Sequence, residues 1–441
     1  MAREMKDSGI EWIGEIPCDW NVQRIKTIFA LRDERNNLPL EEVNLISLYT
    51  DKGVVQHSDL EKTTGNKASN ADGYKMVYEN DIIVNIILCW MGAIGRSSYK
   101  GVTSPAYDIY VPSNAIECRF YHHYFRTKGF SGDCYKRGKG IMAMRWRTYS
   151  DQFRDIKVLV PPLAEQKRIV SYLDTQCAHI DSVIEKTCAA IEEYKKLKQA
   201  VITQAVTKGI RLNREMKDSG IEWIGEVPSA FVCRKLKSLA LLISKGATPK
   251  DISIELDNRH IVRFLKSENI VDNHLKEKPE FRITTDIHEG ELKRSVLSEN
   301  DILFVIAGAS IGKTAVMEIG LLPANTNQAV SFIRIESKYC FAKKYIWYFL
   351  QSEVVKRFIF LFAVQSAQPN LSMENLGSIR MPFPKSKEEV LEIITYLDEK
   401  TAAIDSLIQK KEQLISELEA YKKSLIYEYV TGKKEVPVHA H

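Results

Sequence analysis

Near the start of the chain stands the stretch Arg3-Glu4-Met5-Lys6-Asp7-Ser8-Gly9-Ile10-Glu11-Trp12-Ile13-Gly14-Glu15-Ile16-Pro17, and it returns almost unchanged as residues 214–228. Only Ile16 is replaced, by Val227. A near-identical copy 211 residues further on (Arg3 to Arg214) indicates an internal duplication, which constrains the architecture more than any single element does. We therefore predict two related halves in this chain of 441 residues, which is also too long for one ordinary core.

The duplication continues beyond this stretch, at offsets that grow to 220 and 224 residues. The later copies are Glu79-Asn80-Asp81-Ile82-Ile83 with Glu299-Asn300-Asp301-Ile302-Leu303, Tyr172-Leu173-Asp174 with Tyr396-Leu397-Asp398, and Ile180-Asp181-Ser182 with Ile404-Asp405-Ser406. Elements keep their register while loops change length. Each half is a globular part followed by a helical part, and outside the shared elements the two globular parts differ greatly in sequence.

The helical part of each half predicts one long helix. Residues 164–208 contain no proline and are bounded by Pro161-Pro162 and Gly209. An apolar seam of the heptad type predicts coiled-coil pairing through Leu173, Ile180, Ile184 and Ile191 in the first helix and Leu397, Ile404, Ile408, Ile415, Leu418 and Leu425 in the second. The seam is interrupted at Thr187, Lys198, Thr401, Lys411 and Lys422. Each helix would be roughly 65 Å long. Pairing within the chain is favoured over pairing between two chains.

The globular part of each half predicts a mixed α/β domain. Ile82-Ile83-Val84-Asn85-Ile86-Ile87 and Ile302-Leu303-Phe304-Val305-Ile306 are runs typical of buried strands. An amphipathic helix is expected around residues 339–362, with a counterpart near residues 120–125. The predicted organisation is a first domain over residues 1–160, a long helix over 161–209, a second domain over 210–384, a second long helix over 385–432 and a tail over 433–441.

Composition limits the class of protein. The chain has 62 Lys and Arg against 57 Asp and Glu, so its net charge of +5 permits nucleic-acid binding only if cations gather on one face. No apolar run is long enough for a membrane span, and the N-terminal residues lack a signal-peptide pattern, so a cytoplasmic protein is expected. The eight cysteines form no C-x-x-C pair, which argues against a zinc ribbon and favours reduced thiols.

Several motifs together resemble the specificity subunits of Type I restriction–modification systems. The first is Leu159-Val160-Pro161-Pro162-Leu163-Ala164-Glu165-Gln166-Lys167-Arg168-Ile169-Val170, which leads into Tyr172-Leu173-Asp174. The second half adds Asp301-Ile302-Leu303 with Gly312-Lys313-Thr314, Thr326-Asn327-Gln328 and Gln368-Pro369-Asn370-Leu371-Ser372. The resemblance covers nearly the whole chain, twice over. The first half departs from it, with Thr103-Ser104-Pro105 in place of Thr326-Asn327-Gln328 and Arg145-Trp146-Arg147 in place of the Gln-Pro-Asn segment.

The resemblance implies a fold, a function and partners. In this family each globular part is a target recognition domain, and the two long helices form an antiparallel coiled coil that separates them. Because the two domains have diverged, the implied target is an asymmetric, bipartite, gapped site on double-stranded DNA. The chain would dock modification (methyltransferase) subunits, usually two, and restriction (translocase-nuclease) subunits. It would hold no catalytic residue, metal or cofactor, since S-adenosylmethionine, ATP and Mg would act in the partner subunits. No membrane partner is implied.

Candidate DNA contacts lie in segments that combine cations, amides and glycines. Arginine can bind guanine O6 and N7 with two hydrogen bonds, whereas asparagine and glutamine suit adenine edges. In the first half the candidates are Arg96, Lys136, Arg137, Lys139, Arg145 and Arg147. In the second half they are Lys245, Thr248, Lys250, Lys313, Gln365, Gln368 and Asn370. A solvated surface loop is the alternative for the basic stretch of the first half, and an ordinary turn is the alternative for the amides.

Three other patterns could indicate a binding site, but the sequence supports a binding role for them less well. Gly308-Ala309-Ser310-Ile311-Gly312-Lys313-Thr314 resembles a nucleotide-binding loop, but Ala307 stands where the first glycine is required, so a structural turn is favoured over an NTPase site. His122 and His123 are helical neighbours roughly 100° apart, so they cannot share a metal. The repeated segment around Trp12 is either a docking patch or the turn that leads into the fold. A coiled-coil adaptor with two protein-binding heads is the main alternative function.

Overall fold

A computed structural model describes residues 3–59, 71–113, 115–140, 146–253, 260–363 and 369–437. The chain divides into two units, one formed by residues 1–187 and 413–441 and the other by residues 188–412. Each unit contains one globular part and half of each long helix. We call the globular parts head 1, the described residues up to 160, and head 2, the described residues between 210 and 384. Within the described residues no helix is long and apolar enough to cross a membrane.

Two long helices, α5 (Leu163–Lys208) and α10 (Lys387–Val430), run through both units. The backbone nitrogen atoms of Glu165 and Gln166 donate to the carbonyl oxygen of Pro162, so α5 begins directly after the double proline. Gly209 ends α5 in the left-handed conformation, with φ of 73°, and Gly432 follows α10 with φ of 71°. A left-handed residue at this position is the usual stop for a helix and favours glycine.

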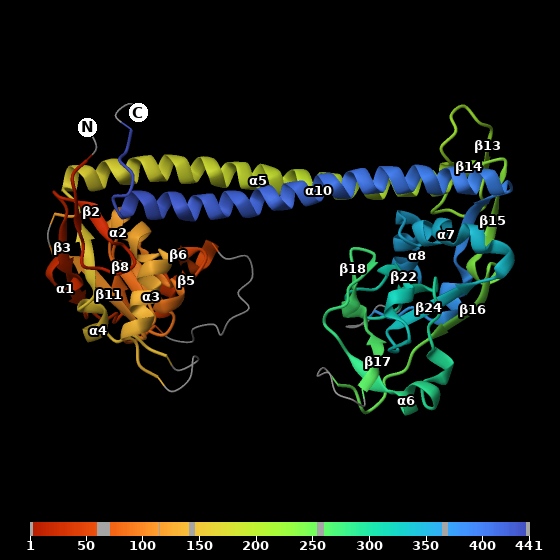
Figure 1. Ribbon diagram of the computed structural model, residues 1–441, viewed down its shortest axis with the longest axis horizontal. Helices are drawn as coiled ribbons and strands as arrows, with labels where there is room; N and C mark the ends of the chain where they lie inside the picture. Colours follow the sequence, from red (N-terminus) through yellow and green to blue (C-terminus); the bar gives the residue numbers. More distant parts are fainter. Residues whose placement is uncertain are drawn as a thin grey trace. The chain divides into compact units, whose positions relative to one another are not determined.

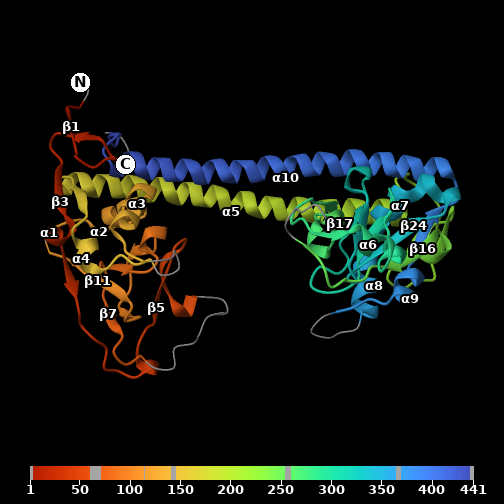
Figure 2. The ribbon, with the colours of Figure 1, turned by 60° about the horizontal axis from the view of Figure 1, so that its bottom comes forward.

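The two helices pack side by side and antiparallel in each unit (Figures 1 and 2). In the first unit Lys422 Nζ lies 2.6 Å from Asp181 Oδ1, and the rings of Tyr172 and Tyr429 are 4.7 Å apart. In the second unit Lys198 Nζ lies 2.6 Å from Asp405 Oδ2. Residue numbers rise along one helix as they fall along the other, so the predicted antiparallel pairing within one chain is confirmed. Two of the lysines that interrupt the predicted seam therefore pair with carboxylates across it.

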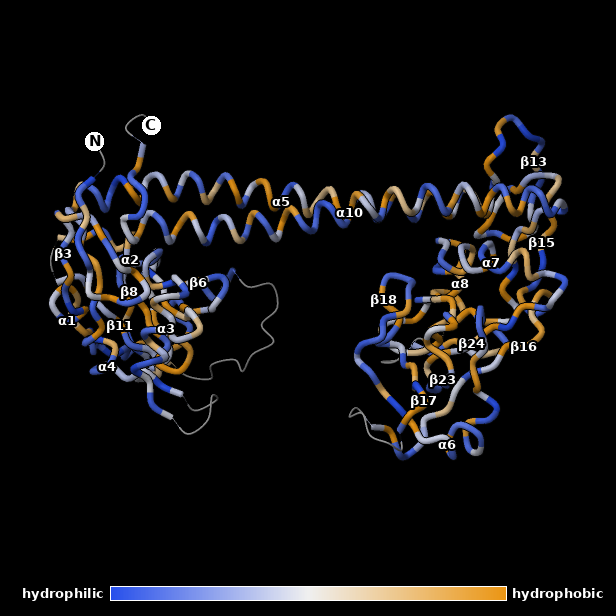
Figure 3. The backbone as a smooth tube through the Cα atoms, in the orientation of Figure 1, coloured by the Kyte–Doolittle hydropathy of each residue, from blue (hydrophilic) through white to orange (hydrophobic). Residues whose placement is uncertain are grey.

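The predicted seam residues occupy two levels of burial. Leu173, Ile180, Ile191, Leu397, Ile404 and Leu425 are buried. Ile184, Ile408, Ile415 and Leu418 are half-buried. Leu173, Ile180 and Leu425 belong to the apolar core of head 1, and Leu397 belongs to that of head 2. Figure 3 shows the same distribution, with apolar segments gathered inside each head and polar and apolar residues mixed along α5 and α10.

Head 1 is built on a four-stranded antiparallel sheet. Its strand order is β4 (Phe29–Arg32), β11 (Tyr107–Pro112), β8 (Ile82–Asn85) and β9 (Ile94–Arg96). The helices are α1 (Ile25–Ile28), α2 (Cys118–Phe125), α3 (Lys128–Arg137) and α4 (Ser150–Arg154). Two-stranded sheets complete it: β1 (Met5–Asp7) with β2 (Glu15–Pro17), β3 (Asn21–Arg24) with β12 (Lys157–Val160), β5 (Ile46–Tyr49) with β6 (Gly53–Gln56), and β7 (Lys75–Val77) with β10 (Gly101–Thr103). Large aromatic side chains, among them Trp20, Phe29 and Phe120, fill the core.

Head 2 repeats this framework. The equivalent sheet has the order β16 (Ala240–Lys245), β24 (Val330–Ile335), β21 (Ile302–Val305) and β22 (Thr314–Val316). The helices are α7 (Lys343–Leu350), α8 (Glu353–Phe362) and α9 (Met373–Ser378). The paired strands β13 (Met216–Asp218) with β14 (Glu226–Pro228) and β15 (Phe231–Lys235) with β25 (Arg380–Pro384) are also repeated.

Head 2 also has elements that differ from those of head 1. A three-stranded sheet is formed by β20 (Arg282–Thr284), β17 (His260–Leu265) and β23 (Ala324–Thr326), and α6 (Thr285–Glu289) follows β20. Strands β18 (Ile270–Val271) and β19 (His274–Leu275) form a hairpin. The two central sheets have the same strand order in spite of these differences. This confirms the prediction of two pseudo-repeated α/β domains with a long helix pair.

The prediction of one helix over residues 339–362 is wrong. A short 3₁₀ segment over residues 337–342 is followed by α7 and α8, and the chain is extended at Ser352, with φ of −68° and ψ of 158°. Side chains of α5 satisfy the backbone at this break, because Thr203 Oγ1 accepts from the nitrogen of Glu353 and Gln199 Nε2 donates to the carbonyl of Gln351. These are tertiary contacts, and the helical period of the local sequence carries no information about them.

The repeated N-terminal stretch ties each head to the start of a long helix. Arg3 pairs with Glu165 of α5, and Arg214 pairs with Glu389 of α10. Both carboxylates are buried. Trp12 of the same stretch donates from Nε1 to Asp133 Oδ2 at 2.7 Å, and its ring lies so close to Gly129 that a Cβ there would stand 2.1 Å from a ring carbon. In this structure the stretch packs into the fold.

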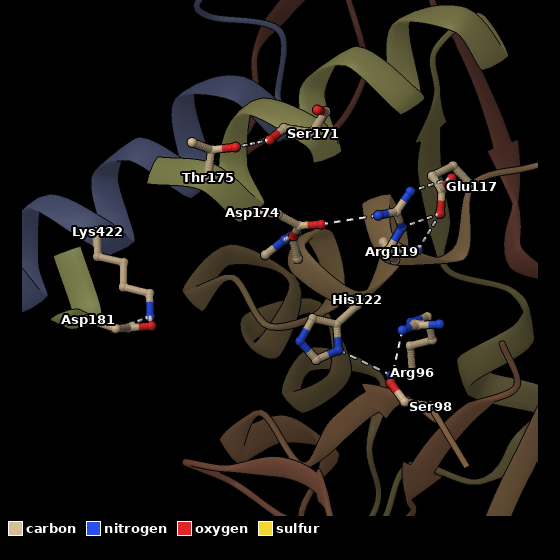
Figure 4. Close-up of polar contacts among 11 residues, drawn as sticks. Arg96, Ser98, Glu117, Arg119, His122, Ser171, Asp174, Thr175, Asp181 and Lys422 are labelled. Atoms are coloured by element: carbon tan, nitrogen blue, oxygen red, sulfur yellow. Dashed lines mark hydrogen bonds and ion pairs between the residues drawn. The ribbon is translucent and has the colours of Figure 1, made fainter. Parts of the chain in front are cut away.

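A second tie joins head 1 to α5. The carboxylate of Asp174 lies 3.3 Å from Arg119 Nη1 and 3.2 Å from His123 Nε2, and Arg119 also pairs with Glu117 (Figure 4). The hydrogen bond from His123 lowers the pKa of Asp174 below its ordinary value. The carboxylate therefore stays charged and holds two donors of α2 against α5.

Candidate nucleic-acid interface

In head 1 the basic stretch forms a short antiparallel bridge beside the end of β8. The backbone nitrogen of Thr148 donates to the carbonyl oxygen of Ile86, directly after the strand, at 2.9 Å. Lys139 and Arg147 exchange two backbone hydrogen bonds, of 2.8 and 3.0 Å. Residues opposed in this way project their side chains to the same face. The structure therefore brings two predicted DNA contacts together.

Aromatic side chains pack beside this bridge. The ring of Trp146 stacks on Tyr135, with centroids 4.9 Å apart, and its Nε1 donates to the carbonyl of Tyr135 at 3.1 Å. Trp90, which follows β8, lies 5.6 Å from the Tyr135 ring. A Cβ at Gly138 would stand 2.3 Å from Trp146 Nε1, so glycine is required for this approach. The bridge is thus held in one position by stacking and by its backbone.

The predicted cationic contacts of head 1 lie in different environments. Lys136 pairs with Glu11 at 2.8 Å, an exposed ion pair, whereas Arg137, Lys139 and Arg147 are exposed and form no ion pair with any described residue. Arg145 lies outside the described residues. Exposed cations without a carboxylate remain available to an anion.

Arg96 of β9 is half-buried, and Figure 4 shows it beside Ser98 and His122. Its Nη1 donates to Asn80 and its Nη2 to Ser98, at 2.7 and 2.9 Å. Its backbone nitrogen donates to Nδ1 of the half-buried His122. Burial lowers the pKa of His122 to about 3, so the imidazole stays neutral and accepts this bond. Arg96 forms no ion pair with a described residue, although the carboxylate of Glu117 is near enough for its pKa to be lowered in part by the Arg96 charge.

In head 2 three segments meet at the end of the equivalent strand, β21. The carbonyl oxygens of Lys313 and Ala329 accept from Val305 and Ile306, at 2.8 and 2.9 Å. The segment around Asn370 lies on the other side, since Leu371 donates to Ile306 and Pro369 accepts from Gly308, at 2.8 and 3.1 Å. Lys313 and Asn370 are both exposed at this strand end.

The segment after β16 joins the same region. Thr248 hydrogen-bonds the side chain of Gln328, and a Cβ at Gly246 would stand 1.7 Å from the carbonyl oxygen of Thr326, so only glycine allows this approach. Lys245, Thr248 and Lys250 are exposed, whereas Gln365 and Gln368 lie outside the described residues. Gln328 is an exposed residue of this site that sequence reasoning missed. Its place directly after Thr326-Asn327, in a segment already recognised as typical, was the available signal.

The glycine loop between β21 and β22 has the geometry of a turn. Gly308 and Gly312 have φ of 84° and 90°, and Gly92 in the equivalent loop of head 1 has φ of 90°. The loop joins two antiparallel strands, whereas a nucleotide-binding loop leads from a strand into a helix whose N-terminus binds phosphate. Among the residues that the structure describes, no group of three or more His, Cys, Asp and Glu side chains could hold a metal ion.

Comparison with known proteins gives the same picture in both halves. The family model of the Type I restriction modification DNA specificity domain matches residues 17–193 and again residues 228–417. The chain is 26% identical over 378 residues to the Type I restriction enzyme MjaVIII specificity subunit of Methanocaldococcus jannaschii, which covers 83% of either chain. It is 25% identical over 384 residues to the Type I restriction enzyme EcoBI specificity subunit of Escherichia coli, covering 82% of this chain and 75% of that one.

Solved structures share the fold at low sequence identity. A chain from a study of complex assembly and conformational transition in the type I R-M system matches with a TM-score of 0.70 and 14% identity, over 95% of this chain and 99% of that chain. The HsdS subunit from Thermoanaerobacter tengcongensis matches with a TM-score of 0.50 and 14% identity, over 95% of this chain and 98% of that one. At this identity the likeness concerns the architecture of the backbone.

Proposed function

The chain belongs to the Type I restriction modification DNA specificity family, and on that premise we propose that it reads an asymmetric, two-part site on double-stranded DNA, one half-site per head. A specificity subunit recognises DNA for its complex. The observation that carries the proposal is the equivalent strand end in each head, that of β8 in head 1 and that of β21 in head 2. In both heads the residue after this strand accepts a backbone bond from an equivalent segment, Ile86 from Thr148 and Ile306 from Leu371. The strand end nevertheless presents Lys139 and Arg147 in head 1 and Lys313 and Asn370 in head 2.

Different side chains on an equal framework are what two different half-sites require. Sequence is read at base edges, while lysine and arginine on phosphates position the protein. The DNA contacts proposed for head 1, to bases or to phosphates, are Arg137, Lys139, Arg145 and Arg147, with Arg96 and Lys136 at its margin. Those proposed for head 2 are Lys245, Thr248, Lys250, Lys313, Gln365, Gln368 and Asn370, to which the structure leads us to add Gln328. The paired helices α5 and α10 would serve as the spacer that fixes the number of unread base pairs.

The chemistry, on this proposal, belongs to other subunits. Two modification subunits would supply S-adenosylmethionine and methyl transfer, and restriction subunits would supply ATP- and Mg-dependent translocation and cleavage. The family supports this division, because its members are recognition components of such complexes. A purified chain that transferred methyl groups to DNA without a partner would contradict the division of labour.

Sequencing of modified bases in the DNA of the native host tests the proposal. The expected result is one motif with two unequal halves separated by a constant gap, and this motif should disappear when the gene for the chain is deleted. A continuous motif, a palindromic one, or a motif that survives the deletion would overturn it. Affinity of the purified complex for the motif should also fall steeply as salt rises, because phosphate contacts release counterions. A protein-binding adaptor would give no motif and no such dependence.

A further inference from the structure

Positions 147 and 370 are structurally equivalent in the two heads. Around them the sequence register is fixed by buried residues that keep one offset of 223 residues. The pairs are Thr148 with Leu371, Phe153 with Leu376, Ile156 with Ile379 and Val158 with Met381, and every member is buried. Arg147 and Asn370 therefore stand at the same step of the chain, directly before the first buried pair.

The same backbone bond holds both positions. In head 1 the nitrogen of Thr148 donates to the carbonyl of Ile86, and in head 2 the nitrogen of Leu371 donates to the carbonyl of Ile306, the residue that follows the equivalent strand. Asn370 is additionally bridged to Ala307, in an antiparallel pairing. It therefore lies in an extended segment, and the alternative that this amide serves an ordinary turn does not describe it.

The side chains at these positions are exposed and uncommitted. In the described part of the chain neither Arg147 nor Asn370 uses its side chain in a hydrogen bond or ion pair. A rigid backbone with a free polar tip is the arrangement that base readout needs, since reading depends on a donor and acceptor pattern held in register with the groove. The two residue types are those that bind two different purines through two hydrogen bonds each, arginine to guanine and asparagine to adenine.

We propose that Arg147 and Asn370 occupy one equivalent base-reading position, with Arg147 reading a guanine in one half-site and Asn370 an adenine in the other. This inference rests on the proposed function, because it assigns specificity within the DNA interface. Lys139, opposite Arg147, takes a different role as a phosphate contact. Two cations placed opposite each other repel, so an anion beside them stabilises the bridge. Lysine acts on a phosphate as a point charge, whereas the planar fork of arginine suits a base edge.

The test is selection of bound duplexes from a randomised library by the assembly that co-purifies with the full chain. Wild type is compared with Arg147→Asn, Asn370→Arg and the control Lys139→Gln. Arg147→Asn should abolish or change the preference for one guanine, with a loss of roughly 10- to 100-fold in discrimination at that base pair and an unchanged second half-site. Asn370→Arg should do the same for one adenine in the other half-site. Lys139→Gln should weaken binding about equally for all sequences and reduce the salt slope by about 1.

Each result bears on one claim. If Arg147→Asn and Asn370→Arg lower affinity uniformly, as Lys139→Gln does, or leave the motif unchanged, the assignment is overturned while the proposed function stands. A wild-type assembly that selects no two-part motif overturns the proposed function itself, and the assignment with it. Equal melting temperatures of the variants, expected because both positions are exposed, confirm that the changes arise at the interface.

Discussion

Head 1 and head 2 each hold a long helix through an aspartate at the equivalent position, but the donors to this carboxylate differ. In head 1 Asp174 of α5 binds Arg119 and His123, while in head 2 Asp398 of α10 binds Lys344 Nζ and the hydroxyl of Tyr348, each at 2.7 Å. The donors stand four residues apart on α2 and on α7, so they lie on one helix face. Equivalent carboxylates are thus held by donors of different chemistry in the two heads. The framework therefore constrains the position and charge of the acceptor more than the chemistry of its partners.

A similar contrast concerns a titratable group inside head 1. His122 of α2 stands where head 2 has Trp347 of α7, which does not titrate. Burial, with help from the nearby charges of His123 and Arg126, lowers the pKa of His122 to about 3. The unfolded chain takes up a proton below a pH of about 6.5, whereas the folded head does not until about pH 3. Between these two pH values the free energy of unfolding falls as the pH falls. Above a pH of about 6.5 His122 is neutral in both states and causes no loss of stability.

The largest expected effect follows from this difference. Acidification from pH 7 to pH 3 should cost wild type on the order of a few kcal/mol more than the variant His122→Asn, which keeps an acceptor for the nitrogen of Arg96 but cannot titrate. Urea unfolding at a series of pH values measures it. A parallel pH dependence in the two proteins would show that His122 is protonated in the folded head.

A second prediction concerns the buried arginine–carboxylate pairs. Trp20 Nε1 donates to Glu165 at 2.9 Å, so Glu165 keeps a donor when Arg3 is lost. At the equivalent of Trp20 head 2 has Phe231, whose ring faces Arg214 at 5.2 Å and offers no donor to Glu389. Arg214→Met should therefore destabilise the protein by about 3 kcal/mol, because it leaves a buried charge unpaired, and Arg3→Met should cost less. Equal losses in urea unfolding would contradict this account of the two sites.

The smallest expected effect is in the helix pair. Lys422→Met removes the partner of Asp181, and Lys198→Met removes the partner of Asp405. Both pairs are partly exposed, so each change should cost about 0.5 kcal/mol or less, and high salt should reduce the difference from wild type. The double variant Asp181→Lys with Lys422→Asp should recover most of the loss. A salt-independent loss would mean that packing of the lysine stem, and not its charge, is what matters.

Much of this architecture could be predicted from the sequence, for identifiable reasons. The duplicated stretch and the heptad seam are one-dimensional patterns, and they led to two heads and a pair of long helices, whose antiparallel direction came from the family resemblance. The break at Ser352 and the partners of Lys198 and Lys422 depend on residues far away in the chain, so no local period reports them. In the sequence, positions 147 and 370 are related only because Arg145-Trp146-Arg147 stands in place of the Gln-Pro-Asn segment. The backbone bonds from Thr148 to Ile86 and from Leu371 to Ile306 establish that the two positions are equivalent.

The charges along the helix seam have a consequence for how such a chain arises. Asp181 and Asp405 are copies of each other, as are Lys198 and Lys422, so the two cross-helix ion pairs are one contact made twice. An ancestral half carrying only the first helix would already meet its own lysine opposite its own aspartate in a symmetric dimer. Fusion of two such halves needs no new seam. It only frees each head to change its face independently of the other.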